Sequence, residues 1–443
     1  MNLLIFKAYD IRGVYPSELD EATAYAVGQA FVLMTQVNQV VVGRDMRLSS
    51  STLFESLVKG ITSAGAEVVD IGEVPIDAVY FAVNHYNYQS GIMITASHNP
   101  KEYNGFKMVK KTADGFVVLR GTELVEYLDK KVGSVEMGRV RELDVMAEFV
   151  EHVLSFSDIS KIKPLKVVVD AGNGMAGKMI PLLEKYVPVE ITKLFFELDG
   201  NFPNHPSNPL EESSQKIIGE KIREVGADAG FIFDGDSDRI FLYDENGRIV
   251  FGDISLILLA RQLLSLPENK GKAVAYNAIC SRSVADFVLE FGGVPIKTPV
   301  GFVNIQKGLQ ENNGIVGGEV SGHYAFANNF CADSGYIAWL ILLEIISQDG
   351  RPVSEIVATY NRYVRSPETN IKLNDKDLAL KKFQEYYQAW PQDLIDGITV
   401  NDADWWINVR PSNTEPLLRV TVEGKDQATT DFRLNEVLGV IKE

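Results

Sequence analysis

The chain has 443 residues, of which 46% are hydrophobic and 23% are charged, and its formal net charge is −17. This length exceeds one ordinary hydrophobic core and favours about three domains. The negative charge argues against nucleic acid and anionic membranes as partners, so an anionic substrate would need a local cluster of Arg and Lys.

The number of cysteines and the length of the apolar runs indicate in which cellular compartment the protein is expected. Cys280 and Cys331 are too few for a disulfide framework, which favours a reducing compartment, and we expect both to be small buried hydrophobes. The N-terminal stretch MNLLIFKAYDIRG has no signal-peptide pattern. No apolar run reaches the ~20 residues that span a bilayer. We therefore expect a soluble cytoplasmic protein.

A pattern of strand, polar loop, helix and strand occurs three times along the chain. It covers residues 39–72, 165–195 and 272–301, and the first strands read QVVVGR, LKVVVD and KAVAYN. Such βαβ patterns are typical of parallel or mixed sheets covered by helices. The sequence therefore predicts three similar α/β domains with mixed sheets.

The C-terminal part follows a different pattern. DLALKKFQEYYQAW (377–390) reads as a helix, and the runs WWINVR (405–410) and LLRVTVEG (417–424) alternate as strands do, which predicts a small α+β domain. The polar segments KIKP and RSPETN support the first and last domain breaks, and the middle break is weakly marked. The predicted domains are residues 1–150, 151–251, 252–362 and 363–443.

Ligands of such sheets bind at loops beyond the carboxyl ends of strands, so these loops carry the candidate residues. The strand-like GIMIT ends just before Ser97 in ITASHNP, where Ser97 is an exposed nucleophile or part of an ordinary turn. The Gly-x-Ser-x-Gly motif of hydrolases is missing there. Asn104-Gly105 then predicts a tight turn, which would bring Lys107 back towards Ser97.

The second loop, FIFDGDSDR, places three carboxylates on alternating positions after an apolar strand. Asp234, Asp236 and Asp238 repel one another unless a cation holds them, and hard oxygen ligands favour Mg²⁺ or Ca²⁺. A solvated acidic turn without metal is the alternative. We reject an EF-hand because Arg239 occupies the position that requires Gly and because a strand precedes the loop.

The third and fourth loops suit a sugar and an anion. In GIVGGEVSGHYAF, Gly317, Gly318 and Gly322 would let the backbone approach a ligand, and Glu319, Ser321 and His323 would share one face if extended. In VRPSNTEPLLRV, phosphate could be held by Arg410, Ser412, Asn413 and Thr414. A glycine-rich hairpin and a capped turn are the structural alternatives.

The loops together resemble a known family. YDIRG, GRDMR, TASHNP, DGDSDR, GGEVSGH and RPSNTEP occur in this order, and the chain resembles the α-D-phosphohexomutase superfamily over nearly its full length. It is most similar to bacterial phosphomannomutase/phosphoglucomutase. The resemblance implies three similar mixed-sheet α/β domains and a C-terminal TATA-binding-protein-like α+β domain around a central cleft.

The resemblance also implies an activity and its residues. The enzyme would interconvert hexose 6-phosphate and hexose 1-phosphate through a phosphoserine and a bound hexose 1,6-bisphosphate, which also serves as activator. Ser97 would carry the phosphoryl group and bind Mg²⁺ together with Asp234, Asp236 and Asp238. Catalysis would involve Lys107, Arg239 and His98, and the substrate would be bound by Tyr9, Arg12, Glu319, Ser321, His323, Arg410, Ser412, Asn413 and Thr414.

Three departures from the family pattern bear on the substrate. Phe302 stands where many mannose and glucose enzymes have His, Ile279 stands where a Lys is common, and Val320 argues against the phosphoglucosamine type. We expect mannose phosphate, and also glucose phosphate, as the substrate of a monomer or homodimer, with no nucleic-acid or membrane partner. The alternatives are a phosphoglucomutase, a phosphoglucosamine mutase or, by class, a metal-dependent phosphatase.

Overall fold

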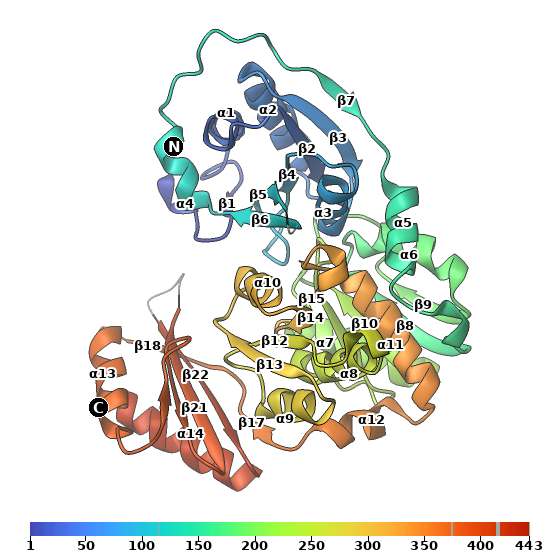
Figure 1. Ribbon diagram of the computed structural model, residues 1–443, viewed down its shortest axis with the longest axis vertical. Coiled ribbons are helices and arrows are strands. Elements are labelled where there is room, and N and C mark those ends of the chain that lie inside the picture. The colour runs from blue at the N-terminus through green and yellow to red at the C-terminus, as the bar shows by residue number, and fades with distance from the viewer. Residues whose placement is uncertain (114, 374, 413–416, 443) are drawn as a thin grey trace. The chain divides into compact units, whose positions relative to one another are not determined.

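A computed structural model describes residues 1–113, 115–373, 375–412 and 417–442. The chain forms two compact units, one of residues 1–251 with 322–354 and the other of residues 252–321 with 355–443 (Figure 1). No helix among the described residues is long and apolar enough to cross a membrane.

The first unit begins with a seven-stranded sheet of order β1-β5-β4-β2-β3-β7, in which β6 pairs with β5. The inner strands β2, β3 and β4 are parallel, whereas β5 runs antiparallel to β4 and β1. The strands are β1 (Ile11–Val14), β2 (Gln39–Arg44), β3 (Glu67–Glu73), β4 (Ser90–Ile94), β5 (Tyr103–Thr112), β6 (Gly115–Leu119) and β7 (Val140–Glu142). The helices are α1 (Glu21–Thr35), α2 (Ser50–Ser63), α3 (Ile76–His85) and α4 (Gly121–Leu124).

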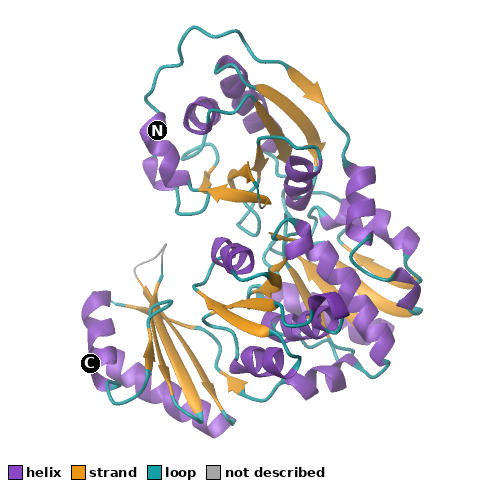
Figure 2. Ribbon diagram, viewed as in Figure 1, coloured by secondary structure: helices purple, strands orange, loops and turns teal. Residues whose placement is uncertain are grey.

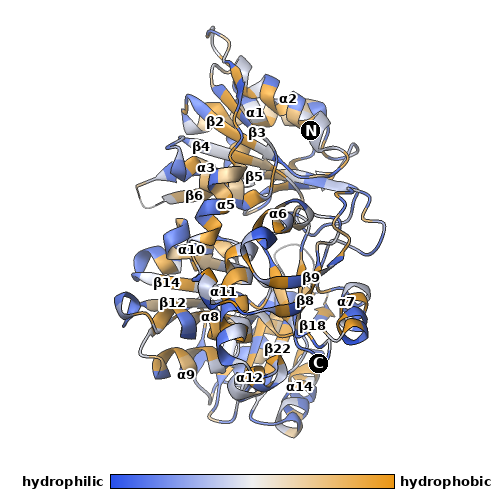
Figure 3. Ribbon diagram, turned by 90° about the vertical axis from the view of Figure 1, so that its right-hand side faces the viewer, coloured by the Kyte–Doolittle hydropathy of each residue, from blue (hydrophilic) through white to orange (hydrophobic). Residues whose placement is uncertain are grey.

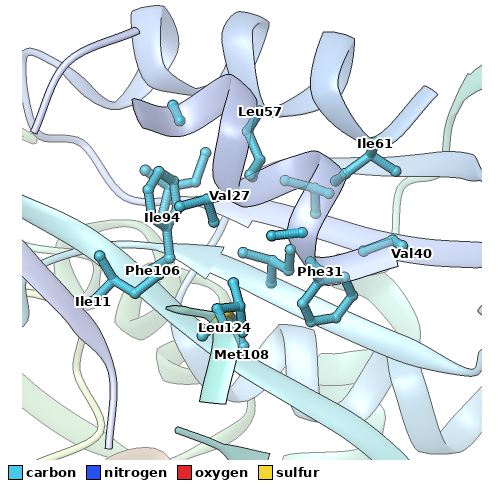
Figure 4. Packing of buried hydrophobic residues seen from close by; sticks show 14 of the residues in the cluster. Ile11, Val27, Phe31, Val40, Leu57, Ile61, Ile94, Phe106, Met108 and Leu124 are labelled. Atoms are coloured by element: carbon cyan, nitrogen blue, oxygen red, sulfur yellow. The ribbon is translucent and has the colours of Figure 1, made fainter. Parts of the chain in front are cut away.

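A hydrophobic core joins this sheet to its helices. Phe31 of α1 and Leu57 of α2 belong to the same buried cluster as Ile94 of β4 and Phe106 of β5 (Figure 4). Burying each such side chain stabilises the fold by roughly 1.5–3 kcal/mol. The core therefore anchors the end of β4 and the start of β5, between which the predicted serine loop lies.

The first unit also contains the second βαβ repeat. Its sheet has the order β11-β10-β8-β9, with β8 parallel to β9 and β10 and antiparallel pairing of β10 and β11. The elements are α5 (Met146–Leu154), β8 (Leu165–Asp170), α6 (Ala176–Leu183), β9 (Val189–Leu194), α7 (Glu212–Val225), β10 (Ala229–Phe233) and β11 (Ile240–Tyr243). The same unit includes β15 (Tyr324–Phe326), β16 (Ala332–Asp333) and α11 (Gly335–Asp349).

The second unit contains the third repeat, in which β12 lies between β13 and β14 and is parallel to both. The elements are α8 (Gly252–Leu264), β12 (Ala273–Asn277), α9 (Arg282–Glu290), β13 (Val294–Thr298), α10 (Phe302–Glu311) and β14 (Gly314–Gly318). α12 (Val353–Tyr360) begins in the first unit and ends in the second. Figure 3 shows hydrophilic and hydrophobic residues alternating along the helices, as expected for helices that cover sheets.

The C-terminal part of the second unit is an antiparallel sheet with helices on one side (Figure 2). Its order is β17-β22-β21-β20-β19, with β18 paired to β22. Phe383 of α13 and Val437 of α14 belong to one buried cluster with Ile407 of β21. The elements are β17 (Val364–Arg365), β18 (Thr369–Lys372), α13 (Lys376–Tyr386), β19 (Gln392–Asp393), β20 (Ile398–Asn401), β21 (Trp405–Pro411), β22 (Leu417–Gly424) and α14 (Gln427–Lys442).

Short 3₁₀ helices complete the described elements: η1 (Leu3–Ile5), η2 (Val125–Tyr127), η3 (Ile159–Lys161), η4 (Glu184–Tyr186), η5 (Pro267–Asn269) and η6 (Ala327–Asn329). The predicted fold class is confirmed, because all three repeats are parallel βαβ units and the C-terminal part is α+β. Both cysteines are buried and free, as expected. The domain boundaries proposed above stay a prediction.

One local prediction was wrong. Asn104 and Gly105 lie inside β5 rather than in a turn, and their partners are Gly13 and Arg12 of β1. The side chain of Asn104 donates to the hydroxyls of Ser49 and Ser50 at the start of α2, and a Cβ on Gly105 would lie 2.0 Å from the Ile11 carbonyl oxygen. Close strand packing, not turn geometry, explains this Asn-Gly pair.

The glycine-rich third loop contains a turn. The chain turns at residues 320–321, so the extended conformation in which Glu319, Ser321 and His323 would share one face is not present. Gly317 lies in β14, where an added Cβ would meet Ile305 and Ala275, so this glycine also allows α10 to pack on the sheet.

Candidate active site

Ser97 lies in the loop between β4 and β5, three residues past the end of β4. It is buried and has a φ of 49°, a backbone conformation that non-glycine residues adopt only under constraint. Its N–H donates to Thr95 Oγ1 at 2.9 Å. A Cβ on Gly235 would lie 2.6 Å from the Ser97 carbonyl oxygen, so the acidic loop approaches this serine at a distance that requires glycine.

The Ser97 hydroxyl points to the acidic loop. Its Oγ donates to Asp234 Oδ2 at 2.7 Å and lies 3.2 Å from His98 Nδ1. A serine held in a strained turn with its oxygen oriented by a carboxylate resembles a positioned nucleophile rather than a turn residue. The predicted proximity of Ser97 and the acidic loop is thus present within the first unit.

Arg47 shapes the serine loop, and no role for it was predicted from the sequence. Its buried guanidinium donates to the carbonyl oxygens of Ser97 and Asn99, at 2.7 Å each, and to those of Pro100 and Tyr103, at 2.8 and 3.0 Å. Asp45 Oδ2 lies 3.3 Å from its Nε. The GRDMR motif contains this residue, but the sequence does not predict its partners. They are backbone carbonyl oxygens about 50 residues away, and hydrogen bonds to backbone atoms produce no recognisable sequence pattern.

The three carboxylates of the acidic loop gather around a cationic side chain. Asp234, Asp236 and Asp238 are buried, and their oxygens lie within 4.8 Å of one another. Lys107 Nζ of β5 lies 2.9 Å from Asp236 Oδ2 and 2.6 Å from Asp238 Oδ2. β10 and β11 flank the loop as antiparallel strands, so the rejection of an EF-hand is confirmed.

The electrostatics of this cluster are strongly perturbed. Burial, with the charges of Asp238 and Asp236, raises the pKa of Asp234. Burial also opposes ionisation of Asp238, but the charges of Lys107 and Arg239 help to outweigh it and hold the pKa of Asp238 well below its usual range. Burial likewise disfavours the charged form of Lys107, yet the two carboxylates raise its pKa well above the ordinary value, so this lysine is protonated. Opposite shifts within one buried cluster are typical of functional sites.

Arg239 and His323 lie at the edge of the acidic loop. Arg239 Nε donates to His323 Nε2 at 3.2 Å and lies 3.7 Å from Asp234 Oδ2. His323 Nε2 is 3.5 Å from Asp238 Oδ1 and 4.0 Å from Asp333 Oδ2. Asp333 was not predicted, because it lies on β16, far along the chain from the acidic motif, and carries no local pattern of its own.

His98 and Arg12 lie beside the serine. Arg12 donates to Asn99 Oδ1 at 2.6 Å and to Asp10 Oδ2 at 2.5 Å. Burial and the positive charges of Arg239 and Arg12 hold the pKa of His98 well below its usual value, so this imidazole is neutral. His98 also lines a pocket of about 530 Å³ together with the segment of residues 201–208. Tyr9 is 37% exposed.

The remaining predicted residues lie in the second unit. Glu319 Oε1 accepts from Asn277 Nδ2 at 3.0 Å and from the Gly301 N–H at 2.8 Å. Because of these two bonds, its carboxylate is fixed at the carboxyl ends of β12 and β14, where ligands of α/β sheets bind. Ser321 follows it in the turn.

The predicted phosphate loop follows β21. Arg410 is buried, and its Nη2 donates to Glu368 Oε2 at 2.8 Å. Ser412 is buried, and its N–H donates to the Leu417 carbonyl oxygen at 2.9 Å. Asn413 and Thr414 lie outside the described residues. An arginine in this setting can bind an oxyanion if its carboxylate partner withdraws.

Comparison with known proteins agrees with this geometry. Family models described as phosphoglucomutase/phosphomannomutase alpha/beta/alpha domains I, II and III match residues 3–119, 147–247 and 251–363, and the C-terminal domain model matches 368–438. The chain is 37% identical over 452 residues to a protein named phosphohexose mutases from Xanthomonas campestris pv. campestris (strain B100), with 100% of both chains covered. It is 35% identical over 456 residues to the phosphomannomutase of Escherichia coli (strain K12), again with 100% of both covered.

A solved structure shows the same architecture. The phosphoglucomutase/phosphomannomutase family protein of Burkholderia thailandensis superposes with a TM-score of 0.89 at 32% identity, covering 100% of this chain and 98% of that one. The family models cover most of the chain, and the full-length relatives exceed 30% identity. The chain therefore belongs to the phosphoglucomutase/phosphomannomutase family and is a phosphohexomutase, an isomerase.

Proposed function

We propose that the chain interconverts hexose 6-phosphate and hexose 1-phosphate through a phosphoserine at Ser97 and a bound hexose 1,6-bisphosphate. The observation that carries this proposal is the Ser97 hydroxyl, which is 2.7 Å from Asp234 in a strained buried turn. A phosphoryl group there carries about −1.5 to −2 charges at neutral pH. Because the carboxylates of the acidic loop repel this charge, a phosphoryl group on Ser97 is stable only if nearby cations compensate it.

The acidic loop fits a bound Mg²⁺. Asp236 Oδ1 and Asp238 Oδ1 are buried and accept no hydrogen bond from the described residues, although Lys107 contacts the other oxygen of each carboxylate and His323 Nε2 lies 3.5 Å from Asp238 Oδ1. Buried carboxylate oxygens of this kind match the hard ligands that Mg²⁺ prefers. We propose that Asp234, Asp236, Asp238 and the phosphorylated Ser97 hold this ion. When bound, it neutralises charge on the transferring phosphoryl group.

The proposed cycle consists of two transfers. In the first, the bond between phosphorus and Ser97 Oγ breaks as a new bond forms to the free hydroxyl oxygen of the sugar, and the proton of that hydroxyl passes to Ser97 Oγ. The bisphosphate then turns within the site. In the second transfer, its other phosphoryl group moves to Ser97 Oγ and the released proton is returned to the sugar oxygen, so that atoms and charge balance over the cycle.

We propose that the charged groups around Ser97 act on the transition state. Lys107 is protonated through its contacts with two carboxylates, which suits charge stabilisation rather than proton abstraction. Arg239 lies 3.7 Å from Asp234 and can face the transferring phosphoryl oxygens. Phosphoryl transfer depends mainly on positioning and on such electrostatic stabilisation. His98 and Arg12, beside the serine, complete the proposed cluster of the first unit.

We propose mannose phosphate, and also glucose phosphate, as the substrate. The names of the E. coli and Burkholderia relatives support these two sugars. Sugar hydroxyls would bind at Glu319, Ser321 and His323, and the phosphate that does not react would bind at Arg410, Ser412, Asn413 and Thr414, with Tyr9 as a further contact. Two residues differ from the family pattern, Phe302 at the start of α10 and the buried Ile279. These differences would narrow the range of sugars that the site accepts.

The test compares turnover of mannose 1-phosphate and glucose 1-phosphate with Mg²⁺ and a trace of hexose 1,6-bisphosphate. The wild type and Ser213→Ala, an exposed serine on α7, are expected to produce the 6-phosphates at equal rates, whereas Ser97→Ala is expected to be inactive. Turnover by Ser97→Ala would refute the phosphoserine. Release of inorganic phosphate faster than isomerisation would instead indicate a phosphatase.

A further inference from the structure

Thr95 lies at the end of β4, two residues before the serine that is proposed to carry the phosphoryl group. It directly follows the last residue of β4 and is 1% exposed. Its N–H donates to the Gly105 carbonyl oxygen of β5 at 3.1 Å, so the pairing of β4 with β5 continues through this residue. A β-branched side chain on a fixed backbone has few rotamers available. The hydroxyl of Thr95 is therefore held in a defined position.

The Thr95 hydroxyl contacts both loops of the candidate site in the first unit. Its Oγ1 accepts from the Ser97 N–H at 2.9 Å and donates to Asp236 Oδ2 at 3.2 Å. Asp236 is 141 residues further along the chain. A hydroxyl can donate and accept at the same time, whereas an aliphatic side chain can do neither. One side chain thus connects the serine loop to the acidic loop.

On the serine side, the hydroxyl supports the turn that presents Ser97. A threonine whose oxygen accepts from the N–H two residues later forms a local turn, and Ser97 has a φ of 49° within it. Ser97 is buried, so without the Thr95 oxygen its N–H would lose its acceptor in a place shielded from water. The hydroxyl therefore stabilises a backbone conformation that non-glycine residues adopt only under constraint.

On the acidic side, the hydroxyl contacts one of the two oxygens of a proposed metal ligand. Asp236 Oδ2 accepts from Thr95 Oγ1 at 3.2 Å and from Lys107 Nζ at 2.9 Å. Asp236 Oδ1 is buried and accepts no hydrogen bond from the residues that the structure describes. Thr95 and Lys107 therefore orient the carboxylate so that Oδ1 is available to a cation. Loss of a partner that orients a metal ligand typically weakens metal binding by about tenfold to a hundredfold.

Turn formation alone does not explain both contacts. The turn uses only a lone pair of the hydroxyl, and its proton could donate to a nearby backbone carbonyl, as the hydroxyl of Thr62 on α2 does with the carbonyl oxygen of Val58 at 2.8 Å. In Thr95 the proton is directed instead to a carboxylate of the acidic loop. This second contact indicates a role that extends beyond the serine loop.

We propose that Thr95 is a positioning residue that holds Ser97 and Asp236 at a fixed separation. Through its hydroxyl, the oxygen that carries the phosphoryl group and the carboxylate that binds the cation are fixed relative to each other. This proposal rests on the proposed function, since it concerns the same serine and the same cation. Because coupling between two sites is reciprocal, cation binding orders the serine loop, and an ordered serine loop favours cation binding.

The test measures Mg²⁺ binding by titration calorimetry in the absence of sugar phosphate. Thr95→Val keeps the shape of the side chain but removes the hydroxyl, and it is expected to bind Mg²⁺ about tenfold more weakly than the wild type. Thr95→Ser keeps the hydroxyl and is expected to bind Mg²⁺ nearly as tightly as the wild type. Thr95→Ala removes the hydroxyl without placing a methyl group beside Asp236, and the same weakening is expected.

A matched control uses the same substitution at another buried threonine. Thr62→Val removes a hydroxyl that donates only within α2, so this variant is expected to bind Mg²⁺ as the wild type does. Hydrogen exchange of the Ser97 amide provides a second measurement. In the wild type and in Thr95→Ser, Mg²⁺ is expected to slow this exchange. In Thr95→Val the amide is expected to exchange faster, and Mg²⁺ is expected to slow its exchange by a smaller factor.

The possible outcomes separate a positioning role from a purely structural one. Wild-type Mg²⁺ affinity in both Thr95→Val and Thr95→Ala would overturn the proposal, even if the Ser97 amide exchanged faster, because Thr95 would then only form the turn. Binding that is equally weak in Thr95→Ser would also overturn it, because the hydroxyl would not be the group responsible. Weaker binding in Thr95→Val and Thr95→Ala alone, together with a wild type that has no mutase activity, would refute the proposed function and retain the positioning role.

Discussion

The loss of Arg47 is expected to disable the serine loop. In Arg47→Met, four carbonyl oxygens of residues 97–103 lose their donor and the buried Asp45 loses its counter-charge. A buried acceptor without a partner costs about 1–3 kcal/mol, and breaking a buried ion pair costs about 3–5 kcal/mol. These terms are not additive, and Pro100 is exposed to water. We expect unfolding free energy to fall by about 4 kcal/mol, a large part of the 5–15 kcal/mol of a typical domain.

Three measurements check this expectation. Urea unfolding gives the free energy, hydrogen exchange of the amides of residues 97–103 gives the local opening, and mutase kcat gives the effect on chemistry. Arg47→Lys keeps the charge but not the planar fork, so an intermediate loss is expected. Arg44→Met is the matched control: Arg44 pairs with Asp70 at 2.8 Å, its side chain is 22% exposed, and its loss is expected to cost about 1 kcal/mol or less. Wild-type kcat and exchange in Arg47→Met would refute the reasoning.

Three further predictions concern metal, charge and pH. Chelation by EDTA is expected to abolish mutase activity, and added Mg²⁺ is expected to restore it. Asp236→Asn is expected to require more Mg²⁺ than the wild type. Mutase activity that does not change when EDTA is added would count against the acidic loop as a metal site. Lys107→Met is expected to lower the unfolding free energy in the absence of metal by about 3 kcal/mol, because it removes the cation that contacts two buried carboxylates. The same variant is expected to gain more stability from Mg²⁺ than the wild type does. A melting temperature equal to that of the wild type, with and without Mg²⁺, would contradict this. Burial alone would lower the pKa of His205, but its hydrogen bond to Asp170 and the charge of that carboxylate raise it. A histidine whose pKa is raised in the folded state stabilises the fold at pH values below its unfolded pKa of about 6.5. This stabilisation is expected to be lost as the pH rises through the folded pKa. Asp170→Asn is expected to remove this part of the pH dependence in thermal unfolding.

The local sequence determined the elements and the chemistry of most loops. The βαβ repeats, the strand before Ser97 and the strand before Asp234 follow from runs of β-branched residues ended by polar loops, and the structure contains them at those places. The type and spacing of the acidic residues were enough to indicate a cation site. Such features can be predicted from the sequence because each depends on residues that are close together in the chain.

Only the tertiary structure decided which of these groups meet and what supports them. Arg47 binds carbonyl oxygens, which every residue possesses, so nothing in the sequence marks its partners. Asn104-Gly105 has the composition of a turn, yet packing against β1 places it in a strand. The hydroxyl of Thr95 contacts Asp236, 141 residues further along the chain, because the fold of the first unit brings the loops after β4 and β10 together. Contacts between distant segments depend on strand register and on backbone atoms, and neither has a signature in the local order of residues.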